Sequence, residues 1–178
     1  MELRARASED VQALTGVLRR VHDADDYPTV WPDDVDRWIV GNGGRGAWVA
    51  VLGDKLAGHV GLSRPGSQPG RQLWTSATQQ PVERLVEVTR LFVGPESRGS
   101  GIGHRLLQRA VDGAHELALW PVLDVRRDGR PGASRLYANA GWRLVGSASR
   151  RLGPEVVLPF DYWIGPPPPA WSCGRRGP

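Results

Sequence analysis

Three glycines alternate with other residues in a basic segment near the middle of the chain, Arg98-Gly99-Ser100-Gly101-Ile102-Gly103-His104. A glycine has no Cβ atom, so the backbone can approach a bound group closely at these positions. A helical pattern begins without a break after the loop, and the unpaired N–H groups at the start of a helix attract anions. The segment therefore predicts a loop that binds a phosphorylated cofactor.

The loop differs from two common phosphate-binding motifs. A mononucleotide P-loop requires Gly-x-x-x-x-Gly-Lys-Ser/Thr, and no lysine lies near Gly103. A dinucleotide-binding fold has Gly-x-Gly-x-x-Gly after an early strand and an acidic residue about 20 positions later. The glycine spacing here is different, but Asp124 lies 21 positions after Gly103. A dinucleotide-binding oxidoreductase therefore stays open as an alternative.

The elements around the loop predict a mixed α/β sheet. A strand over residues 85–93, a helix over 101–117 and a buried strand over 121–125 form a unit that predicts parallel pairing. Residues 47–62 instead read as an antiparallel hairpin that turns at Gly53-Asp54. The other expected elements are a strand over 3–7, helices over 11–21, 35–39 and 133–139, and strands over 142–145 and 156–164.

Two segments are expected to lack regular structure. Residues 64–81 are rich in Gly, Pro, Ser and Gln, which is typical of a long loop. Residues 166–178 contain four consecutive prolines and predict an extended tail. We therefore expect one domain over residues 1–165, followed by a Pro/Gly-rich tail over 166–178.

The composition is that of an ordinary globular protein, with 178 residues, 40% of them hydrophobic. The net charge is +4, but 22 of the 23 basic residues are arginines, a bias that codon usage can produce, so no nucleic-acid partner is expected. No apolar run is long enough to cross a membrane, and no metal is expected. The single cysteine, Cys173, excludes an internal disulfide. Because the start of the sequence also lacks a signal-peptide core, we expect a cytoplasmic protein.

Two motifs resemble one known family. The spacing Arg98-x-x-Gly101-x-Gly103 resembles the acetyl-CoA loop of the GNAT superfamily of N-acetyltransferases. The segment Leu136-Tyr137-x-x-x-Gly141-Trp142 is similar to the family's Leu-Tyr-x-x-x-Gly-Phe motif, with Trp142 in place of Phe. Two motifs in the right order are more specific than one glycine loop. By element order, the resemblance extends over roughly residues 2–164, without the loop 64–81.

The resemblance implies a fold and a cosubstrate. In this family the sheet is mostly antiparallel, with a central parallel pair of strands that splay apart around the pantetheine arm of acetyl-CoA. The main chain of Leu91, Phe92 and Val93 would pair with pantetheine, and the amides from Arg98 to His104 would hold the pyrophosphate. Arg98 would add a positive charge there. Arg130 stands where the family often has an asparagine that contacts the cofactor, and an arginine could meet a phosphate instead.

The resemblance also implies direct acyl transfer to an amine. An amine with a pKa near 10 must lose a proton before it attacks, so a base helps. Glu87 matches the position of the base in some members of the family. A backbone N–H near Leu91 or Phe92 would stabilise the oxyanion. Tyr137 matches the general acid that protonates the leaving thiolate.

The acceptor is expected to be a small-molecule amine or a peptide. Tyr27, Trp31 and Trp74 lie where the family builds its acceptor pocket, and aromatic walls suit an apolar or cationic ligand. Several aspartates before residue 40 favour a cationic acceptor. A homodimer built through the last strand is one arrangement that the sequence allows. His22 and His59 are expected to be structural. A non-catalytic acyl-CoA-binding module is the alternative to an enzyme.

Overall fold

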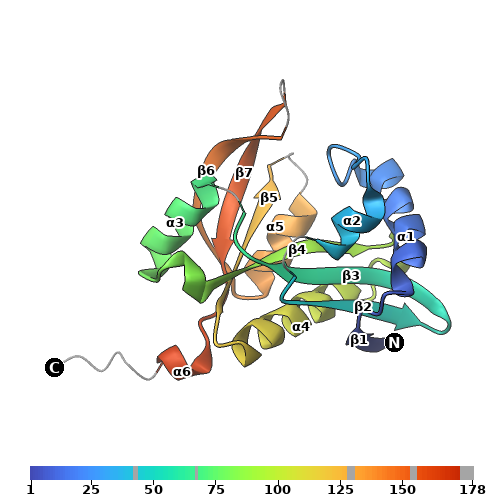
Figure 1. Cartoon of the computed structure of the whole chain (residues 1–178), viewed down its shortest axis with the longest axis horizontal. Helices are drawn as coiled ribbons and strands as arrows, with labels where there is room; N and C mark the ends of the chain where they lie inside the picture. The colour runs from blue at the N-terminus through green and yellow to red at the C-terminus, as the bar shows by residue number, and fades with distance from the viewer. Residues whose placement is uncertain (42–43, 67, 128–130, 153–155, 173–178) are drawn as a thin grey trace. The chain divides into compact units, whose positions relative to one another are not determined.

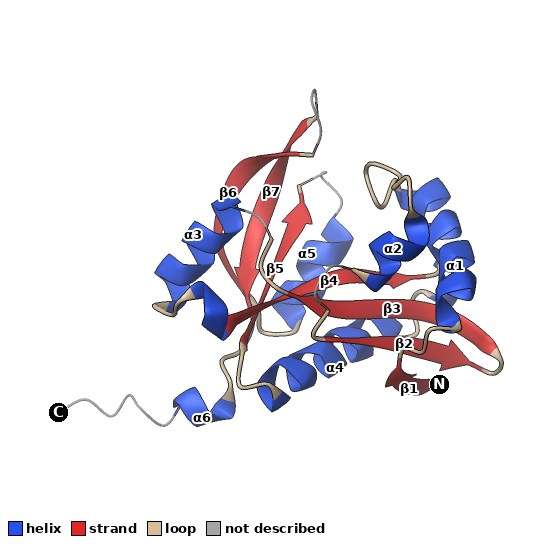
Figure 2. Cartoon of the chain, in the orientation of Figure 1, coloured by secondary structure: helices blue, strands red, loops and turns tan. Residues whose placement is uncertain are grey.

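The computed structural model of the chain describes residues 1–41, 44–66, 68–127, 131–152 and 156–172. Among these residues, no helix is long and apolar enough to cross a membrane. The elements, shown in Figures 1 and 2, are β1 (Glu2–Ala5), α1 (Asp10–Asp25), α2 (Val35–Val40), β2 (Gly46–Leu52), β3 (Lys55–Ser63), α3 (Gln68–Thr78), η1 (Val82–Arg84), β4 (Leu85–Val93), η2 (Pro95–Ser97), α4 (Ile102–Glu116), β5 (Trp120–Arg126), α5 (Pro131–Asn139), β6 (Arg143–Arg151), β7 (Val157–Ile164) and α6 (Pro169–Ser172).

Within the described residues, the strands form a seven-stranded sheet in the order β1-β2-β3-β4-β5-β7-β6. The pairs β1/β2, β2/β3, β5/β7 and β6/β7 are antiparallel. The pair β4/β5 is parallel, with Leu85 opposite Trp120 and Glu87 opposite Val122. The mixed sheet with a central parallel pair, predicted from the sequence, is therefore confirmed.

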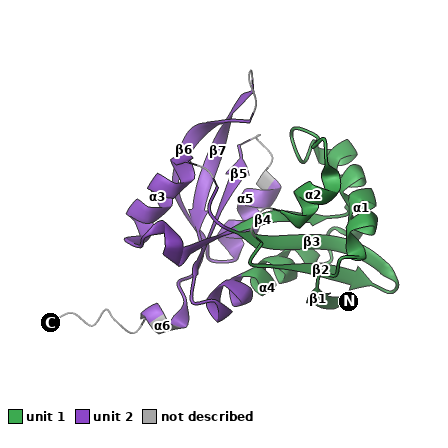
Figure 3. Ribbon diagram, in the orientation of Figure 1, with its two compact units in different colours: residues 1–63, 88–110 green, residues 64–87, 111–178 purple. Residues whose placement is uncertain are grey.

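The chain divides into two compact units, which Figure 3 shows in different colours. Unit 1 comprises residues 1–63 and 88–110, and unit 2 comprises residues 64–87 and 111–178. Strand β4 and helix α4 each contribute residues to both units. The predicted boundary between a domain and a tail at residue 165 stays a prediction.

Helices α1 and α2 cover one face of the strands in unit 1. Leu14, Leu18 and Val21 recur at helical spacing along α1 and pack with Val49 of β2 and Phe92 of β4. Side chains of a strand alternate between its two faces. Trp48 accordingly points to the other face, where the guanidinium carbon of Arg109 on α4 lies 4.5 Å from the centre of its ring. The start of α4 thus belongs to unit 1 and packs on the face of β2 opposite to α1.

Helix α3 in unit 2 corrects the prediction of a long loop over residues 64–81. Residues Gln68–Thr78 are helical, and Trp74 of this helix is 0% exposed. Its ring meets that of Tyr162 on β7 edge-on, with 5.6 Å between the centroids. Leu73 packs so closely on Gly146 of β6 that a Cβ there would lie 2.9 Å from its Cδ2. Packing on the sheet therefore stabilises a helix that its Gly, Pro and Ser content alone does not predict.

Local signals in the sequence set several helix ends. The carboxylate of Asp34 accepts a hydrogen bond from the Arg37 amide at 2.9 Å, so Asp34 caps α2. Gly141, with φ of 78°, ends α5: the amides of Trp142 and Gly141 donate to the carbonyls of Tyr137 and Ala138. The N-terminal capping position of α1 is Glu9, whose side chain makes no capping hydrogen bond.

The expected tail also contains regular structure. Pro169–Ser172 form the short helix α6, where an extended chain was predicted. The ring of Trp171 lies edge-on to that of Trp120, with 6.1 Å between the centroids. The indole therefore anchors this turn to unit 2.

Candidate functional site

The glycine loop presents main-chain N–H groups at the start of α4. Gly99 and Gly101 have φ of 76° and 78°, the left-handed region that residues with a Cβ rarely adopt. The first bond of the helix runs from the Arg105 amide to the Gly101 carbonyl at 3.1 Å. Within the described part of the chain, no backbone oxygen accepts a hydrogen bond from the amides of residues 99–104. Successive free amides at a helix start are what an anionic phosphate requires.

A ligand can also come close to the backbone of the loop. No described atom lies within 4 Å of the position that a Cβ would take at Gly99 or Gly101. Ser100 is exposed, and its hydroxyl donates to the Ser97 carbonyl at 2.7 Å. Ile102, by contrast, is buried and anchors the first turn of α4. The residues present therefore fit a pyrophosphate group held by backbone amides.

Two ion pairs attach the region of the loop to α1. Arg98 pairs with Asp25 through both guanidinium nitrogens, with Nη1 3.2 Å from Oδ1. Arg20 Nη2 lies 2.9 Å from Glu96 Oε1 in the turn η2. The predicted positive charge at the loop is thus present, but in this structure the Arg98 guanidinium faces a carboxylate.

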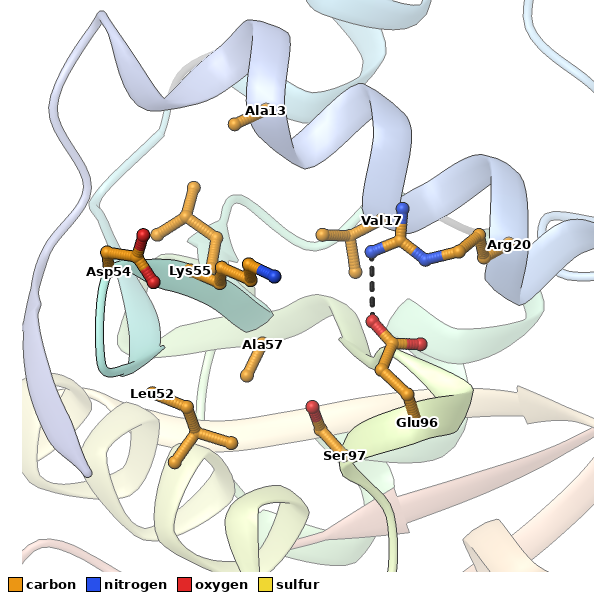
Figure 4. A pocket seen from close by; sticks show the side chains of 10 residues that line it. Ala13, Val17, Arg20, Leu52, Asp54, Lys55, Ala57, Glu96 and Ser97 are labelled. Atoms are coloured by element: carbon orange, nitrogen blue, oxygen red, sulfur yellow. Dashed lines mark hydrogen bonds and ion pairs between the residues drawn. The ribbon is translucent and has the colours of Figure 1, made fainter.

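A pocket of about 470 Å³ lies beside the second of these ion pairs. Figure 4 shows Arg20 and Glu96 joined across it, with Val17 and Ala57 nearby. Its walls come from α1, the β2–β3 hairpin and η2. The contact joins the turn before the glycine loop to α1, but both side chains are about half exposed, so the pair contributes little stability.

The end of β4 holds the segment that was predicted to pair with pantetheine. Phe92 is buried, whereas Leu91 and Val93 are partly exposed. Arg90, just before them, has φ of 53°. A left-handed residue inside a strand interrupts the regular pairing pattern and turns the following main-chain groups. The sequence carries no signal for this irregularity, because arginine has no preference for such a conformation.

The aromatic residues Tyr27 and Trp31 each pack against the core of unit 1. Tyr27 meets the ring of Trp38 edge-on at 6.0 Å, and Trp31 lies 5.0 Å from the ring of His22. The Arg19 guanidinium sits 3.7 Å from the centre of the Trp31 ring. The structure therefore gathers two of the three predicted acceptor-binding aromatics in one unit.

The third aromatic and the predicted base lie in unit 2. Trp74 has no exposed surface, so it cannot touch a substrate unless the packing around it opens. Glu87 is 7% exposed, and its Oε2 accepts a hydrogen bond from the Gly66 amide at 2.8 Å. The carboxylate is thus buried and oriented by the chain that leads into α3.

Tyr137, the predicted general acid, is 8% exposed on α5. Its ring is tilted against the rings of Trp142 and Trp163, with centroids 6.1 and 6.0 Å away. Two indoles therefore restrict the orientation of the phenol. Arg130, predicted to contact the cofactor, lies outside the described residues.

Three of the aspartates before residue 40, which were predicted to favour a cationic acceptor, have partners inside unit 1. Asp25 pairs with Arg98, and Asp34 caps α2. Asp36 accepts a hydrogen bond from the Thr15 hydroxyl at 2.9 Å. Their charge is therefore partly compensated and gives only weak support to a cationic acceptor.

Comparison with known proteins identifies the family. A family model described as "Acetyltransferase (GNAT) family" matches residues 12–142. A comparison with curated proteins finds no match.

Several solved structures share the fold. An N-acetyltransferase from Staphylococcus aureus Mu50 superposes with a TM-score of 0.68 at 17% identity, covering 92% of this chain and 96% of its own. The ribosomal-protein-S18-alanine N-acetyltransferase from Escherichia coli has a TM-score of 0.66 at 16% identity, covering 93% and 92%. A phosphinothricin acetyltransferase from Sinorhizobium meliloti in complex with AcCoA has a TM-score of 0.65 at 21% identity, covering 92% and 88%.

Proposed function

Because the chain belongs to the GNAT family of acetyltransferases, we propose that it transfers the acetyl group of acetyl-CoA to a primary amine by direct transfer. The observation that carries this proposal is the loop 99–104, where two left-handed glycines and a helix start present free amides; the Arg98 amide instead donates to the Pro95 carbonyl at 3.4 Å. Bound acetyl-CoA supplies an activated acetyl thioester. The rest of the chemistry falls to the residues of this chain.

The amides from Gly99 to His104 hold the pyrophosphate of the cosubstrate, and the charge of Arg98 assists them. Arg98 is exposed and paired with Asp25, and an exposed pair of this kind contributes little stability. Replacing Asp25 by a phosphate as the partner of Arg98 therefore costs little free energy. The main chain of Leu91, Phe92 and Val93 binds the pantetheine arm, and an N–H of Leu91 or Phe92 stabilises negative charge on the acetyl oxygen.

Two side chains move protons in this proposal. Glu87 accepts the proton that the acceptor ammonium must lose, directly or through a water. Its buried carboxylate is held by the Gly66 amide, which supports a fixed position. Tyr137 donates a hydrogen bond or a proton to the leaving thiolate, and the rings of Trp142 and Trp163 support its orientation.

Tyr27 and Trp31 form part of the acceptor site in this proposal. The acceptors named for two relatives are a ribosomal-protein alanine and phosphinothricin. Because these differ greatly in size, peptides and small amines both belong in an acceptor screen.

A thermal-shift titration with acetyl-CoA, CoA, NADH and ATP tests the cosubstrate. A ligand at 100 times its Kd adds about 2.7 kcal/mol to the free energy of unfolding. We expect shifts with acetyl-CoA and CoA, followed by release of free thiol when acceptors are added with acetyl-CoA. A shift with NADH or ATP alone would contradict the proposal. Binding of CoA with no turnover across the acceptor panel would support a non-catalytic module instead.

A further inference from the structure

Strand β4 departs from strand geometry at Arg90, directly before the segment that is proposed to bind pantetheine. A left-handed conformation is unfavourable for a residue with a Cβ, so its neighbours must hold it in place. The Arg90 side chain has such neighbours: its guanidinium carbon lies 5.2 Å from the centre of the Trp38 ring, and Nη1 donates to the Thr89 hydroxyl at 3.0 Å. The contact to its main chain comes from a different strand.

His59 of β3 supplies that contact. Its Nδ1 lies 2.9 Å from the Arg90 carbonyl oxygen, and its ring stacks on Phe92 with 5.4 Å between the centroids and 26° between the planes. His59 is 0% exposed. A carbonyl oxygen only accepts hydrogen bonds, so Nδ1 carries the proton. Burial lowers the pKa of His59 to about 4, so the ring is neutral near pH 7.

The two residues before His59 also follow the path of β4 closely. A Cβ on Gly58 would lie only 2.7 Å from the Phe92 carbonyl oxygen. The Gly94 amide donates to the Ala57 carbonyl at 2.9 Å. Three consecutive residues of β3 thus contact the chain from Arg90 to Gly94, at the end of β4. The Arg90 carbonyl and the Leu91 N–H belong to one planar peptide unit, so a rotation of that carbonyl also redirects the Leu91 N–H.

The second ring nitrogen of His59, Nε2, does not account for the presence of a histidine at this position. Nε2 is buried and has no hydrogen-bond partner among the described residues. A buried polar atom without a partner is unfavourable, so an apolar side chain of similar size would pack better. What the histidine adds is the hydrogen bond from Nδ1 to Arg90.

We propose that His59 is a positioning residue for the cosubstrate: its Nδ1–H holds the Arg90 carbonyl and so sets the direction of the main-chain groups of Leu91–Val93. This inference rests on the proposed function, because those groups are the ones assigned to pantetheine. His59 touches neither substrate in this proposal. It acts through the backbone of β4 alone.

Three substitutions at this position separate positioning from packing. His59→Asn keeps a donor close to the place of Nδ1, His59→Gln places its donor near Nε2, and His59→Leu has no donor. Val60→Ala is the matched control, because Val60 is also 0% exposed on β3 but points to the opposite face of the sheet. Each variant is titrated with CoA by calorimetry, and its melting temperature is measured without ligand.

We expect His59→Leu and His59→Gln to bind CoA at least tenfold more weakly, which corresponds to about 1.4 kcal/mol. His59→Asn should stay within threefold of the wild type, and Val60→Ala should lower the melting temperature while keeping the wild-type Kd. With an acceptor in hand, KM for acetyl-CoA should rise while KM for the acceptor stays unchanged.

Wild-type affinity for CoA in His59→Leu and His59→Gln would overturn the inference. Equal weakening in His59→Asn and His59→Gln would do the same, because only the first keeps the donor. If His59→Leu does not fold, the CoA affinities of His59→Asn and His59→Gln still test the inference. Failure of the wild-type chain to bind CoA would refute the proposed function, which is a separate outcome.

Discussion

The buried histidine on β3 predicts a specific loss of stability in acid. The folded state keeps His59 neutral down to its pKa of about 4, whereas an ordinary histidine has a pKa of 6.5. Between these two values the unfolded chain binds a proton that the folded chain does not. The free energy of unfolding therefore falls as the pH drops from about 6.5 to about 4. The full difference is worth about 3 kcal/mol, at about 1.4 kcal/mol for each pKa unit.

The cause of the low pKa is chiefly burial. The nearby charges of Arg6 and Arg90 also lower the pKa of His59, while the hydrogen bond to the Arg90 carbonyl and the charge of Asp10 raise it. Between pH 7 and pH 4.5 the contribution of His59 to the loss is about 2 kcal/mol. Other groups titrate in acid too, since the pKa of Asp10 is lowered by its hydrogen bond from Arg4. A comparison with a variant removes these shared terms.

Urea unfolding of the wild type and of His59→Asn at pH 7, 6, 5 and 4.5 measures this contribution. Asparagine does not titrate, so the variant should lose about 2 kcal/mol less than the wild type across the series. Above pH 7 the free energies of unfolding of the two proteins should change with pH in parallel, because His59 is then neutral in both the folded and the unfolded chain. Parallel loss of stability in both proteins at every pH would refute the assignment of His59 as a buried, neutral side chain.

Three further substitutions test the loop, the core and the proposed acid. Gly101→Ala places a Cβ on a left-handed residue, so it should lower the free energy of unfolding by about 1–2 kcal/mol and weaken CoA binding. The control Gly16→Ala, in the exposed middle of α1, should raise the free energy of unfolding by about 1 kcal/mol. Melting temperatures and CoA titrations are measured for both variants, and equal effects of the two on CoA binding would contradict the role of the loop. Trp74→Ala should cost about 3–5 kcal/mol in urea unfolding, because the side chain is fully buried, and a loss below 1 kcal/mol would mean that α3 is not packed on the sheet. Tyr137→Phe should lower kcat about 10²-fold with an unchanged melting temperature, and wild-type kcat would exclude Tyr137 as the acid.

Features that depend on a few neighbouring residues were predictable from the sequence. Gly53-Asp54 turns the first hairpin, Asp34 caps α2 and Gly141 ends α5, each through a backbone conformation or a side-chain bond within a few positions. The glycine loop before α4 belongs to this group as well. The family resemblance rested on the same local patterns, and the family match over residues 12–142 confirmed it.

The sequence by itself determined the order of the main strands and helices, the glycine turn before α4 and the placement of Tyr137 on a helix, because glycine conformations, capping side chains and apolar periodicity act over short spans of chain. Only the tertiary structure decided that residues 68–78 form a helix, that Trp74 is buried, and that Arg90 in β4 is left-handed, with its carbonyl oxygen hydrogen-bonded to His59. His59 and Arg90 are 31 positions apart, and each of these features depends on contacts between distant segments. Such contacts leave no mark in local composition, since their free energy arises only when the elements pack together.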